Sequence, residues 1–222
     1  MQHKNSIPVI CFLLIESILY YFILTTGGQT LVVTSYLSII LCFLFSLQGI
    51  RRNPLIVAGL ACTVGADFCL LVCDPIQRLW GMVFFLGVQI LYAIHLHRKQ
   101  PSKVLLLVRI ALSIAAEVVT ALILKDNLDA LAMVSMAYYA NLIVNMVAAF
   151  TQWRKSKLLP IGFVLFILCD TIIGLQVAAG GYLPIAEGSL LYNLIFSGFN
   201  TAWMFYLPSQ VLIALCSAKK ET

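Results

Sequence analysis

The stretch PLIVAGLACTVGADFCLLVC, residues 54–73, decides the fold, because it is apolar along its whole length except for one charged residue, Asp67. About 20 residues of α-helix cross the hydrocarbon core of a bilayer. Runs of this kind recur along the chain and are separated by short polar breaks. The eight predicted spans cover approximately residues 7–25, 30–50, 54–73, 79–98, 104–124, 128–151, 158–179 and 187–216.

The composition places the whole chain in the membrane. Of its 222 residues, 62% are hydrophobic and 10% are charged, and the mean hydropathy is +1.00, whereas soluble domains carry about 25% charged residues. We therefore predict an all-α integral membrane protein, a bundle of eight transmembrane helices that forms a single transmembrane domain over residues 1–222. The breaks are too short for a soluble domain, so we expect any chemistry to occur within the bundle.

Basic residues predict the orientation, because Lys and Arg in short loops stay in the cytoplasm. Alternate breaks carry Lys4, Arg51, Arg52, Arg98, Lys99, Lys103, Arg154, Lys155, Lys157, Lys219 and Lys220. The only basic residues in the opposite breaks are Arg78 and Lys125. Both termini are therefore expected in the cytoplasm, and the net charge of +5 reflects topology and anionic lipid heads rather than nucleic acid. The compact loops favour a bacterial cell membrane.

The cysteines predict neither a disulfide framework nor a metal site. All seven lie within predicted spans, and their number is odd. Cys69 and Cys73 are four residues apart, but His95 and His97 are expected at the opposite face of the membrane. We expect no metal and no cofactor.

Two aspartates are the candidate catalytic residues. Asp67 has a counterpart in Asp170, which lies in the apolar run PIGFVLFILCDTIIGL, residues 160–175. An ionisable group at this depth costs several kcal/mol unless it is paired, so it indicates a functional site. Both predicted spans run outward, and both aspartates stand roughly 18 to 20 Å above the inner boundary at 1.5 Å per residue. We therefore expect the two carboxyl groups to face one another.

Matching residues predict an internal repeat. The pairs are Glu16 and Glu117, Tyr36 and Tyr138, Gly59 and Gly162, and Asp67 and Asp170, with offsets of 101, 102, 103 and 103 residues. We predict two parallel four-helix repeats, residues 1–100 and 104–216, with the site where the halves meet.

Helical spacing predicts the lining of this site. The candidate substrate-binding or cavity-lining residues are Gln89, Tyr92, Tyr138, Asn141, Asn145, Asn200, Tyr206 and Gln210, with Asn193 and Ser197 on the stripe of Asn200. The alternative is that these side chains only tie helices together through hydrogen bonds worth about 0.6 kcal/mol each.

Two further residues have simple structural interpretations. Arg109 lies six residues past Lys103, so we expect its side chain to snorkel to the cytoplasmic interface. Pro208 is expected to kink the last span and to free backbone carbonyls in a cavity lining.

A close carboxyl pair supports acid and base catalysis. Two such groups do not readily ionise together, so they tend to share one proton, and one then acts as acid and the other as base. This is the arrangement of two-carboxylate glycoside hydrolysis, which passes through an oxocarbenium-like state. In this chain the substrate would be a lipid.

Several segments carry a resemblance to a known family. They are GADFCLL (65–71), the spaced set Gly81, Phe85, Gln89 and Tyr92, the stretch from Tyr138 to Asn145, GFVLFILCDTIIGL (162–175) and FYLPSQVLIAL (205–215). In order and spacing the chain resembles the YhhN-like family of eight-span membrane proteins, which includes the lysoplasmalogenases.

The resemblance implies hydrolysis of the vinyl ether bond of lysoplasmalogens, lysophospholipids with a vinyl ether chain. The products are a fatty aldehyde and glycerophospho-ethanolamine or glycerophospho-choline. One aspartate would supply the proton, and the other would stabilise the cation and activate water.

The chain departs from the family pattern at two places. Gln89 stands where the family usually has a histidine, and Thr34, Ser35 and Tyr36 replace a lysine followed by proline. Two other classes therefore stay open: a small transporter, which twinned repeats and buried acids also suit, and a non-catalytic lipid-binding protein of the same family.

Overall fold

The structure, a computed structural model, describes residues 6–125, 128–179, 186–196 and 200–219. Its helices are α1 Ser6–Thr25, α2 Gly28–Ser46, α3 Pro54–Asp67, α4 Arg78–Lys99, α5 Lys103–Leu124, α6 Ala130–Phe150, α7 Leu158–Ala179, α8 Leu190–Ile195 and α9 Thr201–Ala218. Within the described part, and with α3 continued by the π-helical turn Phe68–Val72, eight of the helices are long and apolar enough to cross a membrane, and no strand occurs. The predicted all-α, multi-pass fold is confirmed.

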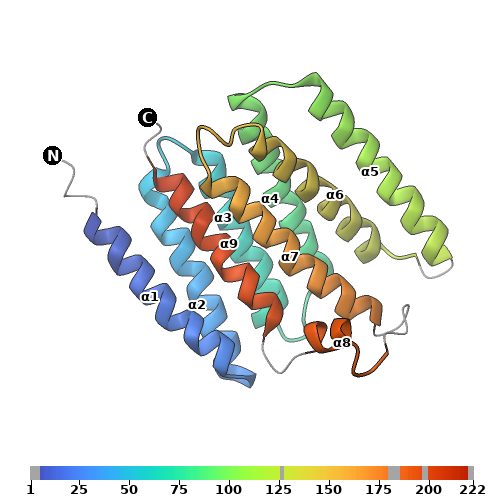
Figure 1. The fold of residues 1–222 in the computed structure, drawn as a ribbon, viewed down its shortest axis with the longest axis horizontal. Coiled ribbons are helices and arrows are strands. Elements are labelled where there is room, and N and C mark those ends of the chain that lie inside the picture. Colours follow the sequence, from blue (N-terminus) through green and yellow to red (C-terminus); the bar gives the residue numbers. More distant parts are fainter. Residues whose placement is uncertain (1–5, 126–127, 180–185, 197–199, 220–222) are drawn as a thin grey trace.

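A ring of helices forms the centre of the bundle. Following the packing, α3 contacts α4, α4 contacts α6, α6 contacts α7, α7 contacts α9, and α9 returns to α3. The remaining long helices lie outside this ring: α2 packs on α3 and α9, α1 on α2 and α9, and α5 chiefly on α6. Figure 1 shows α1 and α5 at the two edges of the bundle. The ring is therefore the part of the fold that positions an interior site.

Glycines let two pairs of ring helices approach closely. A Cβ atom on Gly59 of α3 would lie 2.3 Å from the Tyr92 ring of α4. A Cβ atom on Gly162 of α7 would lie 3.1 Å from Ile213 Cγ1 of α9. Small residues of this kind permit close helix packing in membranes. Each glycine lies eight residues before an aspartate, so the same two helix contacts set the position of both acids. The internal repeat itself stays a prediction.

The basic ends of the helices are tied together. Asn53, just before α3, donates to the Ser217 carbonyl of α9 at 3.0 Å. Lys99, at the end of α4, donates to Asn53 Oδ1 at 3.3 Å. Gln152, just after α6, donates to the Leu96 carbonyl at 3.2 Å. We call this end of the bundle the basic end; the sequence predicts that it faces the cytoplasm.

The last predicted span is wrong in one respect. Instead of one helix over 187–216, the chain forms the short α8 and the membrane-length α9. Asn200 occupies the N-cap position of α9 with a non-helical ψ of 70°. Its amide donates to the Ile23 and Thr26 carbonyls of α1, at 2.7 and 3.3 Å. Asparagine side chains readily bond to backbone groups, so asparagine is favoured at helix ends rather than in helix interiors. The apolar residues on both sides of Asn200 made the segment look like one continuous helix.

Because Asn193 lies on α8 and Asn200 before α9, the predicted polar stripe along one helix does not form. Ser197, also assigned to it, lies outside the described residues, as do Lys4 and Lys220, which the predicted orientation used.

Pro208 leaves a carbonyl in α9 without its helical donor, since proline has no backbone N–H. The carbonyl four residues earlier, that of Met204, accepts a bond from Tyr20 Oη of α1 at 3.0 Å. The sequence predicted freed carbonyls in a cavity lining. The Met204 carbonyl is instead used to join α1 to α9.

Candidate active site

Each of the two aspartates accepts a hydrogen bond from a tyrosine on another helix. Asp67, the last residue of α3, is 4% exposed. Tyr206 of α9 donates its hydroxyl to Asp67 Oδ2 at 2.7 Å. Asp170, in α7 and half-buried, accepts from the hydroxyl of Tyr138 of α6. The packing of the ring helices thus places one tyrosine hydroxyl, from a helix distant in sequence, at each aspartate.

The two aspartate–tyrosine pairs form one cluster. Asp67 and Asp170 lie close enough for their carboxyl groups to interact electrostatically, and Tyr138 interacts with Asp67 as well as with Asp170. The structure therefore brings together the two acids that the sequence placed at one depth. The chain turns just beyond Asp67 through a π-helical turn, in which the Cys73 N–H bonds to the Phe68 carbonyl at 3.0 Å. Such turns are frequent at functional sites.

Two phenylalanines complete the cluster. The ring of Phe85, from α4, lies 5.7 Å from Tyr138 and 6.3 Å from Tyr206. The ring of Phe166, from α7, lies 6.3 Å from Tyr138 and 5.6 Å from Tyr206. We call these four aromatic residues, together with Asp67 and Asp170, the aspartate cage. Every helix of the ring contributes to it.

Phe85 and Phe166 were not among the residues predicted to form the site. A signal for them was present, because Phe166 lies four residues before Asp170 and Phe85 four before Gln89. Residues four apart share one face of a helix. Both side chains are buried.

The chemistry of the cage is that of two acids in an apolar, aromatic environment. Charges interact strongly where water is excluded, so two carboxyl groups that interact there do not readily ionise together. One of the two can then donate a proton while the other accepts one. The tyrosine hydroxyls fix the orientation of both.

A second polar cluster lies next to the cage. Asn145 of α6 donates its amide to Gln89 Oε1 at 2.9 Å and to the Gln89 carbonyl at 2.8 Å. Arg109 of α5 donates to Asn141 Oδ1 at 2.6 Å and to Asn145 Oδ1 at 2.7 Å. Amide oxygens on α6 thus hold the Arg109 guanidinium against the bundle, and its snorkelling to the interface stays a prediction.

The other predicted lining residues form no hydrogen bond to either aspartate in the described part of the chain. Tyr92 is buried against Gly59 and Phe163, with a ring distance of 5.6 Å to Phe163. Asn200 binds α1, as described above. Gln210 is buried, and neither atom of its amide has a partner among the described residues.

The two glutamates of the proposed repeat do not occupy equivalent places. Glu16 of α1 accepts bonds from Ser38 and Cys42 of α2. Glu117 of α5 is half-buried, and its Oε2 has no partner in the described part of the chain. Glu16 thus joins two outer helices and is not part of the cage.

Comparison with known proteins identifies the family and nothing narrower. No curated protein and no solved structure matches the chain. The sequence profile of the YhhN family matches residues 30–216, a range that contains every residue of the aspartate cage. With this match over most of its length, the chain belongs to the YhhN family.

Proposed function

We propose that the chain is an intramembrane lipid hydrolase of the lysoplasmalogenase type, which cleaves the vinyl ether bond of a lysoplasmalogen. The observation that carries this proposal is the aspartate cage: Asp67 and Asp170 interact electrostatically within an aromatic enclosure, and each is oriented by a tyrosine hydroxyl. The products would be a fatty aldehyde and glycerophospho-ethanolamine or glycerophospho-choline.

The reaction needs one proton donor and one base. In the first step the protonated carboxyl group gives its proton to the alkene carbon that is not bonded to oxygen. The ether oxygen shares its electrons, and an oxocarbenium ion forms. Water then adds to the carbon bonded to oxygen, while the other carboxylate takes the water proton. The carboxyl group that took the water proton then gives it to the glycerol oxygen, and the bond between that oxygen and the hemiacetal carbon breaks. The hemiacetal hydroxyl passes its proton to the first carboxylate, which restores the acid, and the aldehyde is released.

The walls of the cage suit this transition state. Aromatic faces attract cations, and the effect is worth about 2 kcal/mol or more where water is excluded. Phe85 and Phe166 line the cluster on which the oxocarbenium charge would develop. Their apolar surfaces also suit the hydrocarbon chain of the substrate.

The test is aldehyde release from lysoplasmenyl-ethanolamine by the purified protein in detergent, followed by mass spectrometry. Each of Asp67→Asn and Asp170→Asn is expected to reduce the rate by at least about 1,000-fold, since each removes an acid or a base from the reaction. Glu16→Gln is the matched control, because it neutralises a buried carboxyl group between α1 and α2 and should leave the rate unchanged.

Turnover that survives both aspartate substitutions would exclude the cage as the active site. Absence of turnover with any lysolipid, together with proton-coupled flux in liposomes, would instead favour a carrier.

A further inference from the structure

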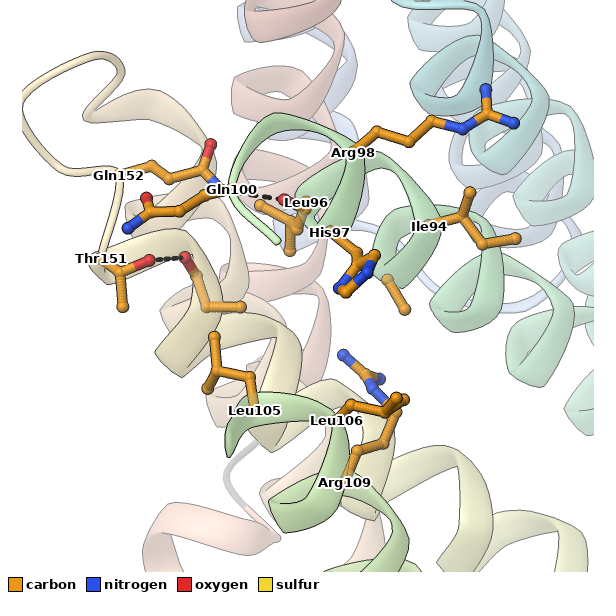
Figure 2. Close-up of a pocket in the computed structure, with 12 residues that line it drawn as sticks. Ile94, Leu96, His97, Arg98, Gln100, Leu105, Leu106, Arg109, Thr151 and Gln152 are labelled. Carbon is orange, nitrogen blue, oxygen red and sulfur yellow. Dashed lines mark hydrogen bonds between the residues drawn. The ribbon is translucent and has the colours of Figure 1, made fainter. Parts of the chain in front are cut away.

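A pocket of about 340 Å³ opens at the basic end of the bundle, between α4, α5 and α6. Its walls combine apolar, amide and basic side chains: Ala93, Ile94, Leu96, His97, Arg98, Gln100, Leu105, Leu106, Arg109, Ala148, Thr151 and Gln152. Figure 2 shows Arg109 and His97 pointing into the same space, whereas Arg98 points away from it. Neither this pocket nor the smaller one beside His95 is lined by an aspartate of the cage.

Arg109 brings an uncompensated positive charge to this pocket. Its guanidinium is half-buried and donates two hydrogen bonds, both to neutral amide oxygens. No carboxylate of the described residues forms an ion pair with it. A guanidinium has five N–H groups, so about three stay available for an anion. A cation inside a membrane protein is costly unless an anion meets it, so the pocket favours a negatively charged ligand.

The shape of the pocket indicates a ligand that has a hydrocarbon chain as well as a charge. Helix α5 packs on α6, and the described parts of α4 and α5 have no extensive contact. The pocket therefore has helix α6 behind it and opens toward the membrane between α4 and α5. Ile94 and Leu106 line that opening and are exposed. A free anion would not bury this apolar surface, but a lipid chain would.

We propose that this pocket binds the phosphate of a glycerophospholipid, with Arg109 as the phosphate ligand and the lipid chain along the opening between α4 and α5. Arginine suits this role because its planar fork binds two oxygens of a phosphate at once. The Asn141 and Asn145 amides hold the fork in place before the lipid arrives. Their position on α6 keeps the guanidinium at the pocket wall.

This lipid site is distinct from the aspartate cage. On α4, Gln89 lies between Phe85 of the cage and Ile94 of the pocket. On α6, Asn145 lies between Tyr138 of the cage and Ala148 of the pocket. Gln89 and Asn145 are fully buried and bonded to each other, so they separate the two sites. The proposal therefore stands whether or not the cage hydrolyses lipid.

Native mass spectrometry of the detergent-purified full chain, titrated with phosphatidylglycerol, tests the proposal. Arg109→Gln is expected to weaken phosphatidylglycerol binding by about tenfold or more, a change of the size expected when a charged hydrogen-bond donor is lost. Arg154→Gln removes the same charge from the same end of the bundle but does not line the pocket, so its affinity should match the unaltered chain. Diacylglycerol with the same chains should bind far more weakly.

A second variant keeps Arg109 intact and keeps the proposal testable if Arg109→Gln does not fold. Leu106→Trp places a larger ring at the exposed mouth of the pocket and should also lower phosphatidylglycerol binding. Unchanged binding in both variants, or equal binding of diacylglycerol, would overturn the lipid-phosphate site. Displacement of the lipid by millimolar inorganic phosphate would show a free-anion site instead.

Discussion

At the scale of single residues, the tyrosine hydroxyls distinguish Asp67 and Asp170 from acids that are merely buried. Each hydroxyl comes from a helix other than that of its aspartate. The bond from Tyr206 to Asp67 spans 139 residues of sequence. Such a bond fixes which carboxyl oxygen faces a substrate, so the phenols are positioning residues for the proposed reaction.

Removing either hydroxyl should therefore slow the reaction without ending it. Tyr138→Phe and Tyr206→Phe are each expected to lower kcat/KM for aldehyde release by about 10- to 100-fold, the range that a hydrogen bond to a charged group contributes. Tyr139→Phe is the control, because Tyr139 neighbours Tyr138 on α6 but shares its bond with Thr171, at 2.8 Å. Equal losses in Tyr138→Phe and Tyr139→Phe would contradict the positioning role.

At the scale of the elements, the α3–α4 contact depends on the absence of a side chain at Gly59. The Tyr92 ring that a Cβ atom would meet at 2.3 Å is itself buried and packs against Phe163. Because Asp67 lies on the same helix, this contact also helps to set the position of Asp67.

Gly59→Ala should thus destabilise the bundle by about 1 to 3 kcal/mol, as overpacking of a core does. Gly87→Ala is the matched control, because it adds the same methyl group to a ring helix where nothing lies within 4 Å. The midpoint of thermal unfolding in detergent measures both. A normal midpoint for Gly59→Ala would show that α3 and α4 are not held this closely.

The proline inside α9, Pro208, provides a second test at this scale. Tyr20→Phe removes the hydroxyl that serves the Met204 carbonyl, and it should cost about 1 kcal/mol of unfolding free energy. In a Pro208→Ala background the restored N–H at position 208 can bond that carbonyl, so Tyr20→Phe should then cost less. Equal costs in the two backgrounds, measured as a double-mutant cycle, would show that proline does not create the need for Tyr20.

At the scale of the whole molecule, the sequence predicted the features that depend on local composition. The spans follow from hydropathy, and Asp67 and Asp170 stand out because each is a single charge in a long apolar run. The partners of these residues come from distant helices, so neither Tyr206 at Asp67 nor the asparagines at Arg109 could be read from spacing. The division of the last span was missed for the same reason, because Asn200 is held by carbonyls of α1.

The arrangement of the whole bundle gives the proposed enzyme one interior site with a contribution from each ring helix. The outer helices then have other roles: α1 and α2 share the buried Glu16, and α5 covers α6 and carries Arg109. This division explains why neutralising Glu16 is expected to spare a reaction that neutralising Asp67 ends.

The most direct test of the aspartate cage as an active site is aldehyde release from lysoplasmenyl-ethanolamine in heavy water. Protonation of the alkene carbon predicts a fatty aldehyde with one deuterium on the carbon next to the carbonyl group. This product should form with the unaltered chain and with Glu16→Gln, and should be lost with Asp67→Asn and with Asp170→Asn. Aldehyde without that deuterium, or labelled aldehyde at an unchanged rate from either aspartate variant, would contradict the account.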